Sequence, residues 1–153
     1  MPTPEQRLAA PPECLDADPF AGRLMTRRLV AVVPEATVLV ALRLMAEHDV
    51  RHVPVIEGGR CLGLVFESDV LRGVGIGLIP STHPPLLVAA LCRPVPILGV
   101  HERRSAAARH MEDAGTDAVL VVEDGALLGI ITATDLIRSL ALDAPPPAPG
   151  VAP

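Results

Sequence analysis

Thr132, Thr134 and Asp135 form the pattern in this chain that is best suited to binding a small molecule. Thr-x-x-Asp is first of all a helix-start signal, in which the threonine caps the helix and the aspartate occupies its third position. The same helix start could offer backbone N–H groups and two hydroxyls to a phosphate. A carboxylate one turn in could accept hydrogen bonds from the two hydroxyls of a ribose. Both interpretations, the cap and the ligand site, stay open on the sequence alone.

Arg51 and His52 are a second pair of interest, immediately before Val53 and Pro54. Arginine is a permanent cation, and a histidine can carry part of a charge near neutral pH. A single arginine is more often a solvated surface residue and a single histidine more often structural. The pair becomes a candidate only if the fold brings it close to other polar groups.

Catalytic and metal-binding patterns are missing from the sequence. No Cys/His cluster has zinc-ligand spacing, and the cysteines Cys14, Cys61 and Cys92 form no C-x-x-C motif. No serine has the surroundings of a nucleophile elbow, and the basic residues are all arginine, which excludes lysine chemistry. We therefore expect no enzyme, no metal and no cofactor.

Composition argues against nucleic acid and membrane partners. The net charge is −5 and the only aromatic residues are Phe20 and Phe66, so neither a basic surface nor a base-stacking platform is available. No apolar run approaches the ~18 residues of a membrane span, and the N-terminus has no signal-peptide pattern. The odd, widely spaced cysteines favour a reducing compartment, so we expect a cytoplasmic protein.

The elements that would position these residues occur twice. Residues 51–57 resemble residues 117–123, 66 positions later, and residues 61–72 resemble residues 127–138. Each copy predicts a short strand, an amphipathic helix, a hairpin across Gly58-Gly59 or Asp124-Gly125, and a second helix. The expected strands and helices, in chain order, are 29–33, 37–48, 53–56, 62–66 and 67–72, then 97–100, 103–114, 118–122, 127–131 and 133–142.

Such a β-α-β-β-α unit leaves one apolar sheet face uncovered, and two copies facing each other would cover both. We therefore expect a mixed α/β (α+β) fold with two repeats packed through their sheets around a pseudo-two-fold axis. The expected organisation is a flexible tail over 1–21, a first domain over 22–73, a linker over 74–85, a second domain over 86–142 and a disordered Pro/Ala-rich tail over 143–153.

This duplicated order resembles the cystathionine-β-synthase (CBS) domain pair. The resemblance rests on residues 129–136, on residues 50–55 and on Leu24-Met25-Thr26, and it covers about residues 22–142. It implies two clefts between the domains, each taking the Thr-x-x-Asp of one copy and the helix-to-strand turn of the other. It also implies an adenosyl ligand (AMP, ADP, ATP or S-adenosylmethionine) and further pairing of the module as a homodimer.

The resemblance places one complete nucleotide site in this chain. Val30, Ala31, Val50 and Val53 could enclose an adenine ring without aromatic residues, and Arg51 and His52 take the place of basic phosphate contacts. The expected nucleotide-binding residues are Val30, Ala31, Val50, Arg51, His52, Pro54, Ile130, Thr132, Thr134 and Asp135.

The second cleft is expected to be weak or empty. Its residues would be Ser68, Asp69 and Val119. Phe66 stands where the first cleft has Thr132 and could fill the space. Asp117 stands where the first cleft has Arg51, and a carboxylate would repel a phosphate.

Two functions remain open from the sequence. The first is a regulatory module that binds an adenosyl ligand and passes a conformational change to an unknown protein partner. The second is a ligand-free dimerisation scaffold.

Overall fold

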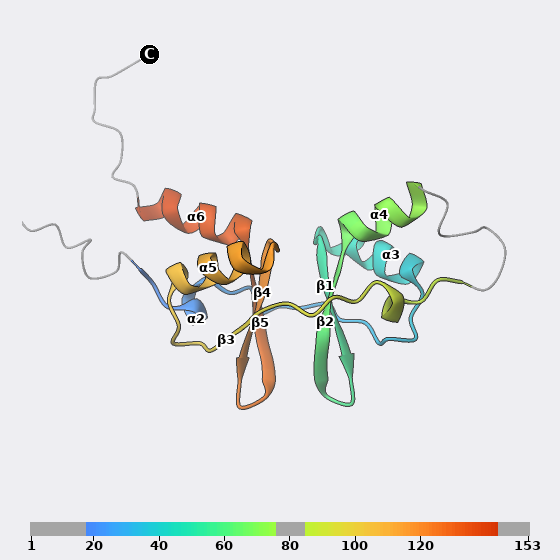
Figure 1. Cartoon of the computed structure of the whole chain (residues 1–153), viewed down its shortest axis with the longest axis horizontal. Helices are drawn as coiled ribbons and strands as arrows, with labels where there is room; N and C mark the ends of the chain where they lie inside the picture. The colour runs from blue at the N-terminus through green and yellow to red at the C-terminus, as the bar shows by residue number, and fades with distance from the viewer. Residues whose placement is uncertain (1–17, 76–84, 144–153) are drawn as a thin grey trace, which may run out of the picture.

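The protein, in a computed structural model that describes residues 18–75 and 85–143, consists of two lobes with a β-hairpin from each at the centre (Figure 1). The elements are α2 (Ala21–Leu24), α3 (Val38–His48), β1 (His52–Glu57), β2 (Arg60–Phe66), α4 (Glu67–Gly75), the 3-10 helix η2 (Val88–Ala90), β3 (Ile97–Leu98), α5 (Arg104–Ala114), β4 (Ala118–Glu123), β5 (Ala126–Thr132) and α6 (Ala133–Asp143). From α3 to α4, each element has a counterpart 66 residues later. The predicted α+β duplication is confirmed.

The two hairpins owe their tight turns to residues with positive φ. Gly58 and Gly59 join β1 to β2 with φ of 56° and 78°, and Asp124 and Gly125 join β4 to β5 with φ of 50° and 78°. Two consecutive positive φ values match the right-handed twist of the flanking antiparallel strands. Both hairpins contain a register shift at the same place, between Val55 and Ile56 and between Val121 and Val122.

The first helix of each repeat packs an apolar stripe against its own hairpin. In α3 the buried residues are Val38, Ala41 and Met45, which recur at helical spacing. Thr37 caps the helix by accepting a hydrogen bond from the amide of Val40 at 3.3 Å. Asp49 ends it in the left-handed conformation, and so the chain turns directly into β1.

The first predicted strand, over residues 29–33, is wrong as a strand. Only Val32 pairs there, by a single parallel bridge to Val55, whereas its counterpart β3 pairs with β4 over two residues. The molecule therefore contains a two-stranded sheet, β1-β2, and a three-stranded sheet, β3-β4-β5. The preceding residues 28–30 line a cavity, which leaves little chain for pairing.

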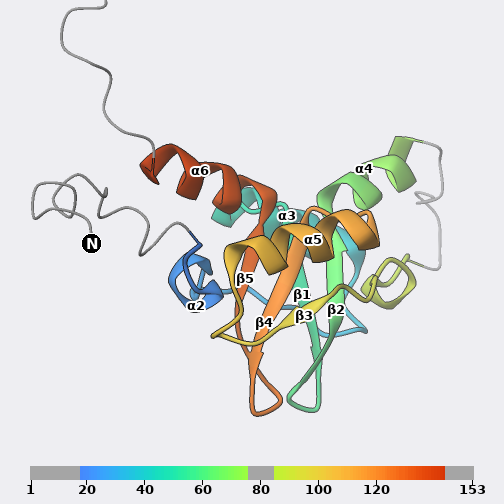
Figure 2. The same cartoon turned by 60° about the vertical axis from the view of Figure 1, so that its left-hand side comes forward.

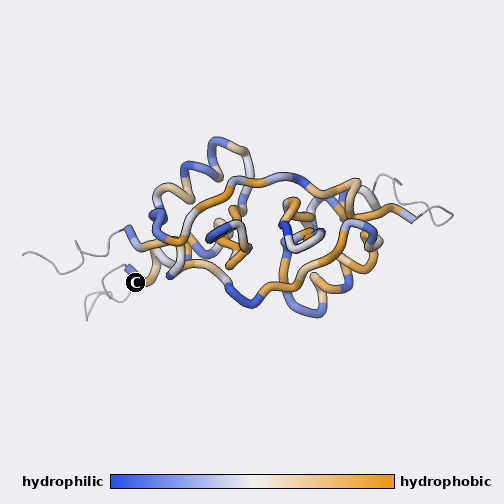
Figure 3. The backbone as a smooth tube through the Cα atoms, turned by 90° about the horizontal axis from the view of Figure 1, so that it is seen from below, coloured by the Kyte–Doolittle hydropathy of each residue, from blue (hydrophilic) through white to orange (hydrophobic). Residues whose placement is uncertain are grey.

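Each repeat is entered by a segment that pairs with the other repeat. Thr26 exchanges two backbone hydrogen bonds with Ile130 on β5, and Arg93 exchanges two with Leu64 on β2. Glycine permits both approaches, because a Cβ on Gly129 would lie 2.8 Å from the Thr26 carbonyl oxygen and one on Gly63 would lie 2.2 Å from that of Arg93. Seen from below, two segments run between the lobes, one on either side of the hairpins (Figure 3).

The exchange extends to the short helices. Ala21 and Met25 of the α2 region pack in the core of the second repeat, and Val88 of η2 packs in the core of the first. Residues 18–21 were expected in a flexible tail; instead, Asp18 accepts hydrogen bonds from the backbone and hydroxyl of Ser105 at the start of α5. Helix α4 continues into the expected linker, to Gly75, and α6 includes Asp143. The rest of the predicted tails and linker lies outside the described residues.

A third apolar cluster joins the repeats. It consists of Leu64 and Phe66 from β2, Ala118 and Leu120 from β4, and Ile130 from β5. The hairpins lie side by side in both views of the molecule (Figures 1 and 2). Removal of this apolar surface from water is the main force that holds the repeats together, as predicted from the uncovered sheet faces.

Candidate functional site

A cavity of about 330 Å³ lies where the two repeats meet. Such a volume is at the lower end of the range for small-molecule sites. The segment before the first repeat, the α3–β1 turn, the end of β5 and the start of α6 all contribute to its wall. The lining residues are Thr26, Arg28, Leu29, Val30, Asp49, Val50, Arg51, His52, Pro54, Ile130, Thr132, Thr134, Asp135 and Arg138.

The cavity brings together nine of the ten residues expected from the sequence; Ala31 is the exception. Ala31 is exposed between Val30 and Val32, and successive residues of an extended chain point in opposite directions. The same alternation removes Val53, which was expected to contact an adenine ring. His52 and Pro54 line the cavity, while Val53 is fully buried in the core of the first repeat.

Five lining residues escaped the sequence analysis, namely Thr26, Arg28, Leu29, Asp49 and Arg138. Arg138 could have been found, because it follows Asp135 by three positions on a predicted helix and such pairs share a face. Thr26 and Arg28 reach the cavity through the pairing of Thr26 with Ile130, a contact between distant parts of the chain that no local pattern encodes.

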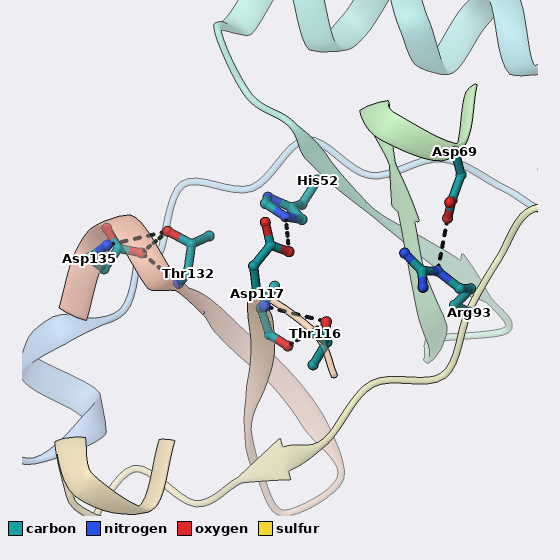
Figure 4. Close-up of polar contacts among 8 residues, drawn as sticks. His52, Asp69, Arg93, Thr116, Asp117, Thr132 and Asp135 are labelled. Carbon is teal, nitrogen blue, oxygen red and sulfur yellow. Dashed lines mark hydrogen bonds and ion pairs between the residues drawn. The ribbon is translucent and has the colours of Figure 1, made fainter. Parts of the chain in front are cut away.

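Thr132 and Asp135 do form the predicted capping arrangement (Figure 4). Asp135 Oδ2 accepts hydrogen bonds from the backbone N–H of Thr132 at 2.8 Å and from its hydroxyl at 2.9 Å. The amide of Asp135 lies 3.4 Å from the same hydroxyl, and the amide of Ala133 donates to the carbonyl of Asp117. Several N–H groups expected to hold a phosphate therefore already have partners, so an anion here would depend on side chains.

Three arginines supply positive charge around the cavity. Arg28 and Arg51 come from the first repeat and its preceding segment, and Arg138 from α6. All three are exposed, and Arg138 lies 3.6 Å from Asp135 Oδ1. Asp49 is the other acidic lining residue. The lining therefore has three arginines and two aspartates, a balance that favours an anionic ligand.

His52 links the two repeats at the cavity wall. Its Nε2 lies 2.9 Å from Oδ1 of Asp117, which precedes β4 in the second repeat (Figure 4). Its ring meets that of Phe66 edge to face, with the centroids 5.0 Å apart. Asp117 was expected to oppose a phosphate in the second cleft; in the structure it is the partner of a residue of the first.

At the pseudo-symmetric position of the second cleft, side chains of the chain contact one another. Arg93 lies over the Phe66 ring at 4.2 Å from its centroid, and its Nε is 2.8 Å from Asp69 Oδ2. Ser68 is exposed, and Val119 is enclosed in the core of the second repeat rather than in a cleft, because it faces the same way as Val53.

Cysteines and histidines among the described residues are candidates for metal ligands and reactive thiols. Within residues 18–75 and 85–143, no group of three or more metal-ligating side chains comes together. Cys61 and Cys92 are free and half-buried, and burial raises the pKa of both thiols; the neighbouring Cys61 raises that of Cys92 further. A raised pKa leaves a thiol protonated and unreactive. Cys14 lies outside the described residues.

Among the helices that the structure describes, none has the length and apolar character to cross a membrane.

These features define a class: a duplicated β-α-β-β-α module whose halves exchange their entering segments and share a cavity. The model of the CBS domain matches residues 21–75 and again residues 88–142. The chain therefore belongs to the CBS domain family and contains two copies of the domain.

Curated relatives include the inosine-5'-monophosphate dehydrogenase of Korarchaeum cryptofilum, which is 31% identical over 119 residues, 76% of this chain and 23% of the relative. Hypoxic response protein 1 of Mycobacterium tuberculosis is 35% identical over 75 residues, 49% of each chain. The chain spans less than half the length of these two relatives.

Among solved structures, CBSX2 in complex with AMP is 30% identical, with a TM-score of 0.66 over 80% of this chain and 96% of that one. The structure of Hypoxic Response Protein I with two coordinated zinc ions is 25% identical, with a TM-score of 0.65 over 78% of this chain and 97% of that one.

Proposed function

We propose that this protein is a non-catalytic regulatory module that binds an adenosyl ligand, AMP, ADP, ATP or S-adenosylmethionine, in the cavity between its two CBS domains. The observation that carries the proposal is the convergence of Thr132, Thr134 and Asp135 from the second repeat with Arg51 and His52 from the first. A ligand that touches both repeats can favour one relative arrangement of them over another, and a protein partner can respond to that difference.

Each part of such a ligand has a matching part of the wall. Asp135 is mostly buried, and its carboxylate could accept hydrogen bonds from a ribose diol. The arginines at positions 28, 51 and 138 could pair with phosphate oxygens. Leu29, Val30, Val50 and Ile130 offer an apolar surface to the base. The complex of CBSX2 with AMP, at 30% identity, supports a ligand of this class.

A second candidate function is a homodimeric scaffold whose clefts stay empty. Apolar side chains are exposed on α4, at Leu71, and on α6, at Ile137 and Leu140. The two helices lie on the same side of the molecule (Figure 1). An exposed apolar surface of this kind favours association with another protein or a second copy.

The free thiols of Cys61 and Cys92 support our proposal of a reducing, cytoplasmic setting.

Thermal unfolding with AMP, ADP, ATP and S-adenosylmethionine tests the proposal. A ligand at 100 times its dissociation constant should stabilise the wild-type protein by about 2.7 kcal/mol. Asp135→Asn keeps an acceptor for the Thr132 amide but loses the charge, and it should weaken binding by roughly 10-fold or more. Asp113→Ala, on the exposed face of α5 and away from the cavity lining, is the control and should bind like the wild type.

The outcomes separate the two candidate functions. Stabilisation by one ligand that is lost in Asp135→Asn and kept in Asp113→Ala supports the regulatory module. If none of the four ligands raises the melting temperature, the scaffold is the better account, and the nucleotide site is wrong.

A further inference from the structure

A continuous row of side chains runs from the position of the second cleft to the wall of the cavity. It begins at Asp69 on α4 and passes through Arg93 and Phe66 to His52, which lines the cavity. Asp69, Arg93 and His52 are drawn in Figure 4. Of these four residues, only His52 lines the cavity. His52 is therefore the member of this row through which the other three would reach a ligand.

Arg93 is fixed at both ends. Its backbone exchanges two hydrogen bonds of 2.9 Å with Leu64, at the close approach that Gly63 permits. Oδ2 of Asp69 is buried, and the Arg93 Nε, 2.8 Å away, forms an ion pair with it and supplies its counter-charge. Because Arg93 is 50% exposed and Asp69 is 15% exposed, solvent weakens this ion pair, and the backbone pairing with Leu64 is the other constraint on Arg93. Arg72 is a weaker second partner at 3.9 Å.

Phe66 contacts both the Arg93 guanidinium and the His52 ring, so it connects the position of one to that of the other. Its ring is 4% exposed and carries the Arg93 guanidinium at 4.2 Å from the centroid, an arrangement with a favourable cation–π attraction. The same ring meets His52 at 81°, with centroids 5.0 Å apart. Phe66 occupies the position that Thr132 holds in the other repeat, so the residue that removes a hydroxyl from one cleft supports the wall of the other.

His52 depends on this support, because its polar partner is a surface group. Asp117 is 62% exposed, whereas the His52 side chain is 11% exposed. A contact with an exposed carboxylate holds a side chain only weakly. Packing against Phe66 is therefore the firmer of the two constraints on the imidazole.

We propose that Arg93 is a positioning residue for the ligand cavity: bound to Asp69 in the opposite cleft, it holds Phe66, and through Phe66 it holds His52 against the ligand. This inference rests on the proposed function, because its effect on affinity requires that the cavity be occupied. It assigns a role in binding to a residue on the other side of the pseudo-two-fold axis.

The test measures AMP affinity by calorimetry on a double variant, Arg93→Ala with Asp69→Asn, which removes both members of the ion pair and so strands no buried charge. The dissociation constant should rise about three- to tenfold. Arg72→Ala, the matched control, removes a cation near Asp69 that does not contact Phe66, and it should bind like the wild type. The single variant Arg93→Lys keeps Asp69 and a cation beside it, and it should retain most of the affinity.

A double-mutant cycle with His52→Ala distinguishes positioning from a general loss of stability. If Arg93 acts through His52, the Arg93→Ala/Asp69→Asn change should have no further effect on affinity when His52 is already alanine. An equal loss in both backgrounds, or wild-type affinity in the double variant, would overturn the inference and leave the proposed function standing.

A second measurement does not need a ligand. The His52 ring protons, assigned by their loss in His52→Ala, should be shifted by the facing Phe66 ring in the wild-type NMR spectrum and should move in the Arg93→Ala/Asp69→Asn variant. Unchanged signals would overturn the inference. If the wild type binds none of the four adenosyl ligands but the signals do move, the proposed function fails and with it the role of Arg93 in binding.

Discussion

The two clefts of this molecule are built from equivalent positions and have opposite contents. In one, Thr132 and Asp135 face Arg51 and His52 across an open cavity of about 330 Å³. In the other, Phe66 and Asp69 face Arg93, and the guanidinium lies on the aromatic ring. The aspartate is common to both clefts. Each aspartate lies near an arginine three positions on, Arg72 or Arg138, but Asp69 also pairs with Arg93 from the segment that enters the second repeat.

Few substitutions account for this difference. Phe66 in place of Thr132 removes a hydroxyl and adds a ring, and Asp117 in place of Arg51 removes a cation from the wall. Arg93 pairs with Leu64 in the way that Thr26 pairs with Ile130, and it brings a cation of its own to the remaining carboxylate. The duplicated fold thus gives the two clefts an equivalent backbone, and the side chains determine which cleft has an open cavity.

The largest effect should come from the two glycines beside the backbone pairings between the repeats, Gly63 next to Arg93–Leu64 and Gly129 next to Thr26–Ile130. Gly63 has φ of +151° and no room for a Cβ beside the Arg93 carbonyl, whereas Gly129 meets the flexible Met25 side chain and the Thr26 carbonyl. Gly63→Ala should lower the free energy of unfolding by about 3 kcal/mol, since strain and a backbone clash combine. Gly129→Ala should cost about 1–2 kcal/mol. Urea denaturation measures both.

Gly58→Ala is the control for these variants, because this glycine also has positive φ but open space around it. It should cost about 1 kcal/mol, from backbone conformation alone. Equal losses of unfolding free energy at Gly63 and Gly129 would contradict the idea that the two glycines differ in the room they have for a Cβ.

A second prediction concerns the number of ligands bound. Because Arg93 lies over Phe66 and pairs with Asp69 at the second cleft, calorimetry on the wild type should give one AMP per chain. Phe66→Thr with Arg93→Ala introduces a hydroxyl and removes the internal cation, and it should create a second site, weaker than the first by about tenfold or more because it lacks a counterpart of Arg51. Two sites in the wild type, or one in this variant, would show that these side chains do not close the cleft.

The smallest effect is expected where the N-terminal segment joins the second repeat. Burial raises the pKa of Asp18, but hydrogen bonds from the Ser105 hydroxyl and amide, with the charges of Arg104 and Arg103, outweigh it and hold the pKa below its ordinary value. A carboxyl with a lowered folded-state pKa stabilises the protein above its unfolded pKa and loses that contribution as pH falls through the folded value. Asp18→Asn should therefore cost about 1 kcal/mol at pH 7.

The difference between Asp18→Asn and the wild type should shrink below about pH 4, the unfolded pKa of an aspartate. Thermal unfolding of both proteins at a series of pH values from 7 to 3 measures this difference. Asp113→Asn, on the exposed face of α5, should show no such dependence. A constant difference across this range would mean that the stabilisation does not come from the Asp18 charge.

Local patterns in the sequence were sufficient for most of the frame. The repeat at 66 residues and the turns at Gly58-Gly59 and Asp124-Gly125 depend on neighbours in the chain, and they predicted both hairpins. The strand over residues 29–33 failed because that segment also crosses to the second repeat and lines the cavity. Its apolar residues are those of a strand, but only Val32 is free to pair.

The candidate site was predictable to the extent that it follows recurring motifs. Asp135 recurs as Asp69, and Thr132 and Arg51 belong to segments that repeat, although Phe66 and Asp117 stand at their counterparts; the cavity contains all three predicted residues. Arg93 belongs to no motif. Its position above Phe66 depends on the close approach of its backbone to Gly63, 30 positions earlier in the chain, and on the carboxylate of Asp69 on α4. A pattern search along the chain does not register such contacts.

The exchange of entering segments has a consequence for how this protein can be divided. Because α2 completes the second core and η2 completes the first, the repeating unit in the sequence and the structural unit in space are different pieces of chain. The arrangement is that of two subunits that have swapped their leading arms and been joined end to end. Neither repeat, expressed alone, carries the arm that finishes its own core, so the smallest part able to fold is the pair.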